Sequence, residues 1–175
     1  MNRKRFLFVD GYNIINAWPH LVSIKNNISL SASREELINI LSEFQALGDE
    51  KVYLVFDAYL AKGERTIGER DYKNIKIYFT KEKETADSYI ERILDLTGKK
   101  DIIRVATDDN LIQQTILSRG GTRLSSEELL IEYNSLKKQL SRMKVRKPDY
   151  QQKNLVTLDE DMKNILDEIS KNLKE

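Results

Sequence analysis

The chain has 175 residues, of which 33% are charged, and its net charge of +1 is too small to indicate a nucleic-acid partner by itself. It has no cysteine and one histidine, His20, which excludes disulfides, cysteine-based zinc sites and histidine clusters. A metal site would need carboxylate ligands, which suit Mg²⁺ or Mn²⁺.

Length and hydropathy bound the organisation of the chain. The 175 residues show no break in composition, which predicts one domain. No apolar run approaches the length of a membrane-spanning helix, and no signal-length apolar segment follows the basic start MNRKRF. We therefore expect a cytoplasmic protein without membrane contact.

The stretch from Phe6 to Ile15 has the pattern of a strand that leads into a ligand site. Phe6 to Val9 is entirely apolar, which is typical of a strand buried on both faces of a parallel sheet. Asp10 follows at the carboxyl end, where ligands bind in open α/β folds. Gly11 would permit a sharp turn, and Asn13 would direct its amide to the same edge. Taken alone, the Asp-Gly pair indicates an ordinary turn equally well.

The same arrangement recurs twice. Lys51 to Phe56 predicts a strand followed by Asp57, and Asp101 to Ala106 predicts one followed by Thr107, Asp108 and Asp109. Thr122 to Leu124 is a candidate short last strand.

A further strand is expected at Ile75 to Phe79, near an edge of the sheet. Thr85 is a candidate N-cap for the helix that follows, which places Asp87 in its first turn. The helix dipole alone would also account for an acid there.

Three pairs of residues have the spacing of a capping box, which marks a helix start: Ser33–Glu36, Ser125–Glu128 and Thr157–Glu160. The apolar stripe over residues 158–173 predicts a C-terminal amphipathic helix that docks on the same domain or, alternatively, binds a partner protein. We expect Ser23 to Ser33 to be a loop with a short helical piece. Leu60 to Asp71 is expected to be a charged loop, either a solvated connection or a basic segment that touches phosphates.

Strands and helices alternate along the chain, which indicates a parallel sheet flanked by helices. In such a sheet Asp10, Asp57 and Asp109 emerge at one edge, and Asp87 joins them. Four carboxylates in one pocket repel each other, which a divalent cation would relieve. Such a site can hydrolyse phosphodiester bonds without a protein nucleophile. Asn13 and Thr107 would then orient an acid or a water on the metal.

Four ordered segments resemble one family, the YacP-like branch of the NYN domains, which are relatives of PIN-domain nucleases. The segments are Val9–Asn13, Val55–Ala58, Phe79–Asp87 and Val105–Asp109. The resemblance implies a PIN-like three-layer α/β fold with a mainly parallel sheet over residues 1–147. Residues 148–175 would form a linker and the C-terminal helix, packed on that domain.

The resemblance also implies a metal-dependent endoribonuclease that associates with the ribosome and cleaves mRNA in the decoding site. Carried over by motif, the catalytic and metal-binding acids are Asp10, Asp57, Asp87 and Asp109, with Mg²⁺ or Mn²⁺ as the ion and no small-molecule cofactor. The family usually has a small residue where Asp108 stands, which favours Asp109 as the functional acid. Asp108 is then expected to be a supporting residue, as are Asn13 and Thr107.

We expect RNA to lie across basic side chains that hold its phosphates. The candidates are Lys62, Arg65, Arg70, Lys81, Lys83, Arg142, Lys144, Arg146 and Lys147. Two alternatives stay open: a non-catalytic RNA- or ribosome-binding adaptor with the same fold, and cleavage of DNA in place of RNA.

Overall fold

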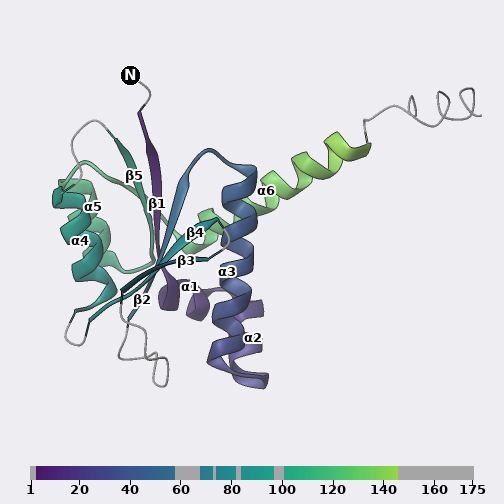
Figure 1. Ribbon diagram of the computed structural model, residues 1–175, viewed down its shortest axis with the longest axis horizontal. Coiled ribbons are helices and arrows are strands. Elements are labelled where there is room, and N and C mark those ends of the chain that lie inside the picture. Colours follow the sequence, from purple (N-terminus) through teal and green to yellow (C-terminus); the bar gives the residue numbers. More distant parts are fainter. Residues whose placement is uncertain (1–2, 58–67, 73, 82–83, 97–100, 146–175) are drawn as a thin grey trace, which may run out of the picture. The chain divides into compact units, whose positions relative to one another are not determined.

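The computed structural model of the protein describes residues 3–57, 68–72, 74–81, 84–96 and 101–145 (Figure 1). The chain divides into two compact units, Met1–Lys137 and Lys138–Glu175. The fold given below is that of the first unit. The predicted linker and C-terminal helix, with the capping box Thr157–Glu160, lie outside the described residues.

A six-stranded sheet in the order β3-β4-β2-β1-β5-β6 forms the centre of this unit. Its strands are β1 (Arg5–Asp10), β2 (Lys51–Phe56), β3 (Gly68–Tyr72), β4 (Ile75–Phe79), β5 (Ile102–Ala106) and β6 (Thr122–Leu124). All neighbouring strands pair in parallel except β3, which pairs with β4 in antiparallel fashion. The predicted α/β fold with a mainly parallel sheet is confirmed.

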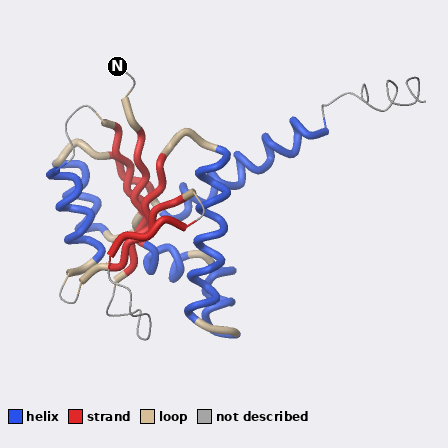
Figure 2. The backbone as a smooth tube through the Cα atoms, viewed as in Figure 1, coloured by secondary structure: helices blue, strands red, loops and turns tan. Residues whose placement is uncertain are grey.

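Helices cover both faces of the sheet, which gives three layers (Figure 2). The helices are α1 (Gly11–Ala17), α2 (Pro19–Asn27), α3 (Leu30–Leu47), α4 (Ala86–Leu96), α5 (Asn110–Ser118) and α6 (Ser126–Val145). The helices α2 and α3 lie on one side of the sheet, and α4 and α5 lie on the other (Figure 1). No helix in the described ranges combines the length and apolarity needed to cross a bilayer.

The central strand β1 contributes to two apolar cores, one on each face of the sheet. Leu7 and Val9 belong to the core shared with α1, α2, α3 and the start of α6. Phe8 faces the opposite way, into the core formed with α4 and α5, where it joins Ile90 and Ile116. Because both faces of this strand are covered, its apolar run has no polar interruption.

The polar segment after α1 is more helical than predicted, and α3 begins earlier. Ser29 caps α3, since its Oγ accepts a hydrogen bond from Ala32 N at 3.0 Å. The predicted capping box at Ser33 and Glu36 is wrong. Ser33 is buried inside α3, and its hydroxyl donates to the Leu21 carbonyl at 2.9 Å. Packing of α2 on α3 therefore uses the side chain that the local pattern assigned to a cap.

The predicted charged loop from Leu60 to Asp71 needs correction at its end. Residues Gly68–Tyr72 form β3, with Gly68 opposite Phe79 and Tyr72 opposite Ile75. This strand places β4 second from the edge of the sheet. Residues 58–67 lie outside the described residues.

Two predicted helix caps are confirmed. Thr85 Oγ1 accepts a hydrogen bond from Ser88 N at 3.1 Å. In the capping box, Ser125 N donates to Glu128 Oε2 at 2.7 Å and Glu128 N donates to Ser125 Oγ at 3.1 Å. The reciprocal bonds satisfy two backbone donors at the start of α6.

Gly11 serves close packing, and the sharp turn that the sequence suggested is not its role. It is the first residue of α1, where a Cβ would lie 2.3 Å from Cε1 and 2.5 Å from Cδ1 of Phe56. The ring of Phe56 is fully buried. The absence of a side chain at Gly11 thus lets α1 approach the end of β2.

We expect Gly11→Ala to lower the free energy of unfolding by about 1–3 kcal/mol, because the added methyl group overlaps a buried ring that cannot move freely. Urea denaturation measures the effect. Gly48→Ala is the matched control, since a Cβ there meets only the Phe44 carbonyl oxygen at 3.4 Å. Equal losses for the two variants would contradict this account of Gly11.

Candidate active site at the carboxyl edge of the sheet

The four predicted acids all lie at strand ends or helix starts. Asp10 ends β1, Asp57 follows β2, Asp87 is in the first turn of α4, and Asp109 precedes α5. The strands β2, β1 and β5 are neighbours and parallel. Asp10, Asp57 and Asp109 therefore leave the sheet at its carboxyl edge.

The electrostatics of Asp10 link it to the other three acids. Its pKa is raised from 3.8 to about 6, chiefly by burial, while the hydrogen bond from Asn13 N acts to lower it. The charges of Asp87, Asp109 and Asp57 each contribute to the rise. We call these four acids the carboxylate cluster.

The pKa of Asp87 is raised as well, first by burial and then by the charges of Asp109, Glu91 and Asp57. Glu91 was missed in the sequence, although it follows Asp87 by one helical turn and the i, i+4 spacing puts both on one face of α4. Five carboxylates thus contribute to the negative potential at this edge.

Two members of the carboxylate cluster are helix N-caps, which sets where their side chains point. Asp10 Oδ1 accepts a hydrogen bond from Asn13 N at 3.2 Å at the start of α1. Asp109 Oδ1 accepts one from Leu111 N at 2.8 Å at the start of α5. A carboxylate at a helix N-terminus is favoured by the helix dipole, which offsets part of the mutual repulsion.

The predicted supporting residues Asn13 and Thr107 both hold the segment from Thr107 to Asp109, which we call the β5–α5 loop. Asn13 Oδ1 accepts a hydrogen bond from Asp108 N at 2.9 Å. The buried Thr107 hydroxyl accepts one from Asp109 N at 3.1 Å. These contacts support Asp109 from the backbone side.

The adjacent acids Asp108 and Asp109 have different surroundings. Asp109 contributes to the potential at Asp10, whereas the Asp108 carboxylate accepts hydrogen bonds from Ser126 N at 2.8 Å and from the Ser126 hydroxyl. The structure therefore places Asp109 in the carboxylate cluster and Asp108 at the start of α6.

The predicted basic residues fall into three groups. Lys81 is exposed and follows β4 closely, and Arg70 lies on β3. Arg142 and Lys144 lie on α6 beyond Lys137, in the second unit. The remaining candidates, outside the described residues, are Lys62, Arg65, Lys83, Arg146 and Lys147. Their role in binding RNA stays a prediction.

The carboxylates suit a hard divalent cation chemically, because they offer charged oxygen donors whose repulsion a cation would relieve. Their side chains are not gathered around one point, however. In the described part of the chain, no three carboxylate or imidazole groups are placed so that they could hold one ion. A cation would therefore have to draw the side chains inward.

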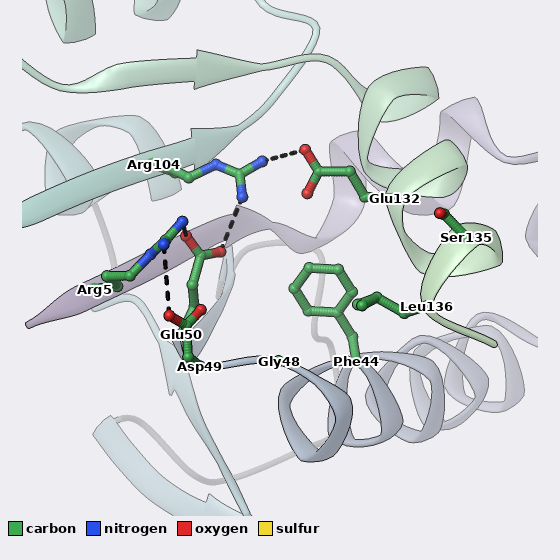
Figure 3. A pocket seen from close by; sticks show the side chains of 9 residues that line it. All are labelled: Arg5, Phe44, Gly48, Asp49, Glu50, Arg104, Glu132, Ser135 and Leu136. Carbon is green, nitrogen blue, oxygen red and sulfur yellow. Dashed lines mark hydrogen bonds and ion pairs between the residues drawn. The ribbon is translucent and has the colours of Figure 1, made fainter. Parts of the chain in front are cut away.

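A pocket of about 240 Å³ lies at the opposite, amino end of the sheet (Figure 3). Its polar wall is a charge network in which Arg104 bonds Glu50 at 3.1 Å and Glu132 at 2.6 Å, while Arg5 pairs with Glu50 at 3.4 Å. Opposite charges alternate here, so the network fastens α6 to the sheet. Sequence reasoning did not find it, since its members are far apart along the chain.

Comparison with known proteins identifies the family of this fold and site. The profile of the YacP-like NYN domain matches residues 7–171. The chain belongs to this nuclease-like family. The uncharacterized protein YacP of Bacillus subtilis (strain 168) is 39% identical over 142 residues, which are 81% of this chain and 81% of that protein.

Two crystal structures of Rae1 (YacP) from Bacillus subtilis are similar to this member of the family. One has a TM-score of 0.70 and 34% identity over 95% of this chain and 93% of that one. The other, of a mutant form of the same protein, has a TM-score of 0.69 and 33% identity over 87% of this chain and 90% of that one. The agreement extends over almost the whole length of both chains.

The raised pKa of Asp10 predicts a stability gain on neutralising it. The folded state holds this proton up to about pH 6, whereas the unfolded chain releases it near pH 3.8, so the folded state loses stability as pH rises between these values. Asn keeps the cap and removes the charge. Without divalent ions at about pH 8, Asp10→Asn should unfold with a free energy up to about 3 kcal/mol higher than that of the wild type.

Urea denaturation in EDTA at about pH 8 and about pH 4 checks this gain, which should vanish at the lower pH. Asp95→Asn is the control, because the Asp95 side chain is 59% exposed and pairs with Arg119 at 3.2 Å. A destabilised Asp10→Asn at the higher pH would show that the carboxylate is compensated within the fold.

Proposed function

We propose that this protein is a divalent-metal-dependent endoribonuclease. The carboxylate cluster at the carboxyl edge of the sheet is the observation that carries the proposal. Membership of a nuclease-like family supports it, and so does the location, since open α/β sheets bind ligands at this edge. The chain has no cysteine and one histidine, which suits a hydrolysis that needs no protein nucleophile.

Asp10 and Asp87 would be direct ligands of Mg²⁺ or Mn²⁺, with Asp57 and Asp109 completing the site. When bound, such a cation acidifies a water molecule and stabilises the charge that develops on the phosphate. Asp10 holds a proton more tightly than an ordinary carboxyl group, so protons would compete with the cation for this side chain below about pH 6. Asn13 keeps the β5–α5 loop against α1, and so supports Asp109.

The proposed substrate is mRNA, cleaved on the translating ribosome in its A site, within the cytoplasm. The nine basic candidates named above would hold phosphates, which makes binding weaker at higher salt. Of these, exposed Lys81 lies between β4 and Asp87 in the sequence and is well placed to act near the carboxylate cluster. We propose no membrane association and no small-molecule cofactor.

A non-catalytic adaptor that binds RNA or the ribosome is the second candidate. The side chains of the described residues do not form a ready-made ion site, which favours a role without catalysis. The retention of all four acids favours catalysis. Binding of RNA without cleavage under any divalent ion, including on translating ribosomes, would decide for the adaptor. Comparing RNA and DNA substrates with one preparation tests the third possibility, DNA cleavage.

We expect Asp10→Asn and Asp87→Asn each to lower RNA cleavage by about a hundredfold or more, since each removes a charge from the proposed ion site. Mapping RNA 5′ ends in cells that carry each variant measures the loss. Asp95→Asn is the matched control, as it removes a charge from the same helix α4 at an exposed position. Wild-type cleavage by Asp10→Asn would remove the proposal.

Binding of the ion is expected to be visible apart from activity. Millimolar Mg²⁺ or Mn²⁺ should raise the melting temperature of the wild type, because a ligand that binds only the folded state stabilises it. The double variant Asp10→Asn/Asp87→Asn should show no such rise. EDTA should reverse the shift and stop cleavage. An equal rise in both proteins would place the ion elsewhere.

A further inference from the structure

The β5–α5 loop carries Asp109 and is held by hydrogen bonds from several other parts of the chain. Thr107 N donates to the carbonyl of Leu124, the last residue of β6, at 3.0 Å. Asn13, on α1, accepts from Asp108 N at 2.9 Å. Ser126, the first residue of α6, donates to the Asp108 side chain. Gln113, on α5, also donates from its side chain to the Thr107 carbonyl at 3.1 Å. Of these contacts, the pair of bonds with Ser126 is the one made by the Asp108 side chain.

Asp108 is bonded on both sides. Its backbone N–H reaches Asn13, which is 95 residues away in sequence, and its carboxylate reaches Ser126, which is 18 residues away. Oδ1 accepts from the Ser126 backbone N–H at 2.8 Å, and Oδ2 accepts from the Ser126 hydroxyl. Both carboxylate oxygens are therefore used, in charge-assisted bonds at a helix N-terminus that favours a negative charge. Ser126 is 7% exposed, whereas Asp108 is an exposed residue, so the contact is partly buried.

We infer that Asp108 is a positioning residue for Asp109: by tying the β5–α5 loop to the start of α6, it sets the direction of the Asp109 carboxylate. Asp109 follows directly, so fixing the main chain and side chain of Asp108 restricts the rotation of the next residue. The Asp109 carboxylate then meets the Leu111 N–H at 2.8 Å. The expected effect of Asp108 on cleavage rests on the proposed function. Its expected effect on the β5–α5 loop is independent of that function.

A role limited to capping α6 is the simpler alternative. That helix already has a complete capping box, in which Ser125 and Glu128 satisfy each other's backbone N–H groups. Ser125→Ala therefore weakens the same helix start without touching the bonds between Asp108 and Ser126. It is the matched control for any effect that passes through α6 stability alone.

The experiment compares Asp108→Ala, Asp108→Asn and Ser125→Ala with the wild type. The first readout is hydrogen exchange at the Leu111 amide, which reports directly on the Asp109 carboxylate because it donates to Oδ1. Asp108→Ala should speed this exchange roughly tenfold relative to the wild type. The Ser88 amide, bonded to Thr85 Oγ1 in α4, should not change.

The second readout is the Mg²⁺ concentration that gives half-maximal RNA cleavage. Loss of a group that orients a ligand weakens metal binding on the order of tenfold to a hundredfold, so Asp108→Ala should need correspondingly more Mg²⁺. Asp108→Asn should restore both readouts, since its amide can accept from Ser126 N and donate to the Ser126 hydroxyl. Ser125→Ala should match the wild type in both.

Unchanged Leu111 exchange in Asp108→Ala, or an equal change in Ser125→Ala, would overturn the inference while leaving the proposed nuclease activity intact. A wild-type protein that fails to cleave RNA would overturn the proposed function instead. In that case the exchange measurement alone still decides whether Asp108 positions Asp109. Urea denaturation of each variant shows that it is folded before either readout is taken.

Discussion

The burial of an acid beside other acids at one edge of a parallel sheet is the constraint on which the candidate site depends. Because β2, β1 and β5 are neighbours, the chain leaves all three strands at the same edge and delivers an acid each time. Burial and three nearby charges keep Asp10 protonated to about pH 6. Such an arrangement opposes folding, and the cation of the proposed function would relieve that cost.

Helix starts position three of these acids and at the same time stabilise their negative charge. Asp10 caps α1, Asp109 caps α5, and Asp87 lies in the first turn of α4. Each helix presents the positive end of its dipole to a carboxylate. At Asp10 the helix α1 follows the strand β1 at once, and Gly11 allows this by leaving room for Phe56.

The two ends of the sheet use charge in opposite ways. At the amino end, Arg5 and Arg104 alternate with Glu50 and Glu132, so each charge there has a partner of opposite sign. At the carboxyl end four acids gather, and burial together with repulsion raises the pKa of two of them, Asp10 and Asp87. Alternating charges hold elements together, whereas neighbouring carboxylates repel each other. The ion pairs thus lie at the end of the sheet opposite to the end where catalysis is proposed.

The sequence by itself determined the parallel strands and the helix starts at Thr85 and Ser125, because apolar runs such as Phe6 to Val9 and local caps act through neighbours a few residues away. It missed the start of α3, because Ser33 is used in packing against α2. It also identified which acids end those strands. It could not find β3, since Gly68–Tyr72 has no apolar pattern and is a strand only through pairing with β4. Local pattern did not distinguish Asp108 from Asp109, which are chemically identical and adjacent, and only the family resemblance favoured Asp109. The physical difference between them came from the tertiary structure, because the partner of the Asp108 carboxylate is Ser126 at the start of α6.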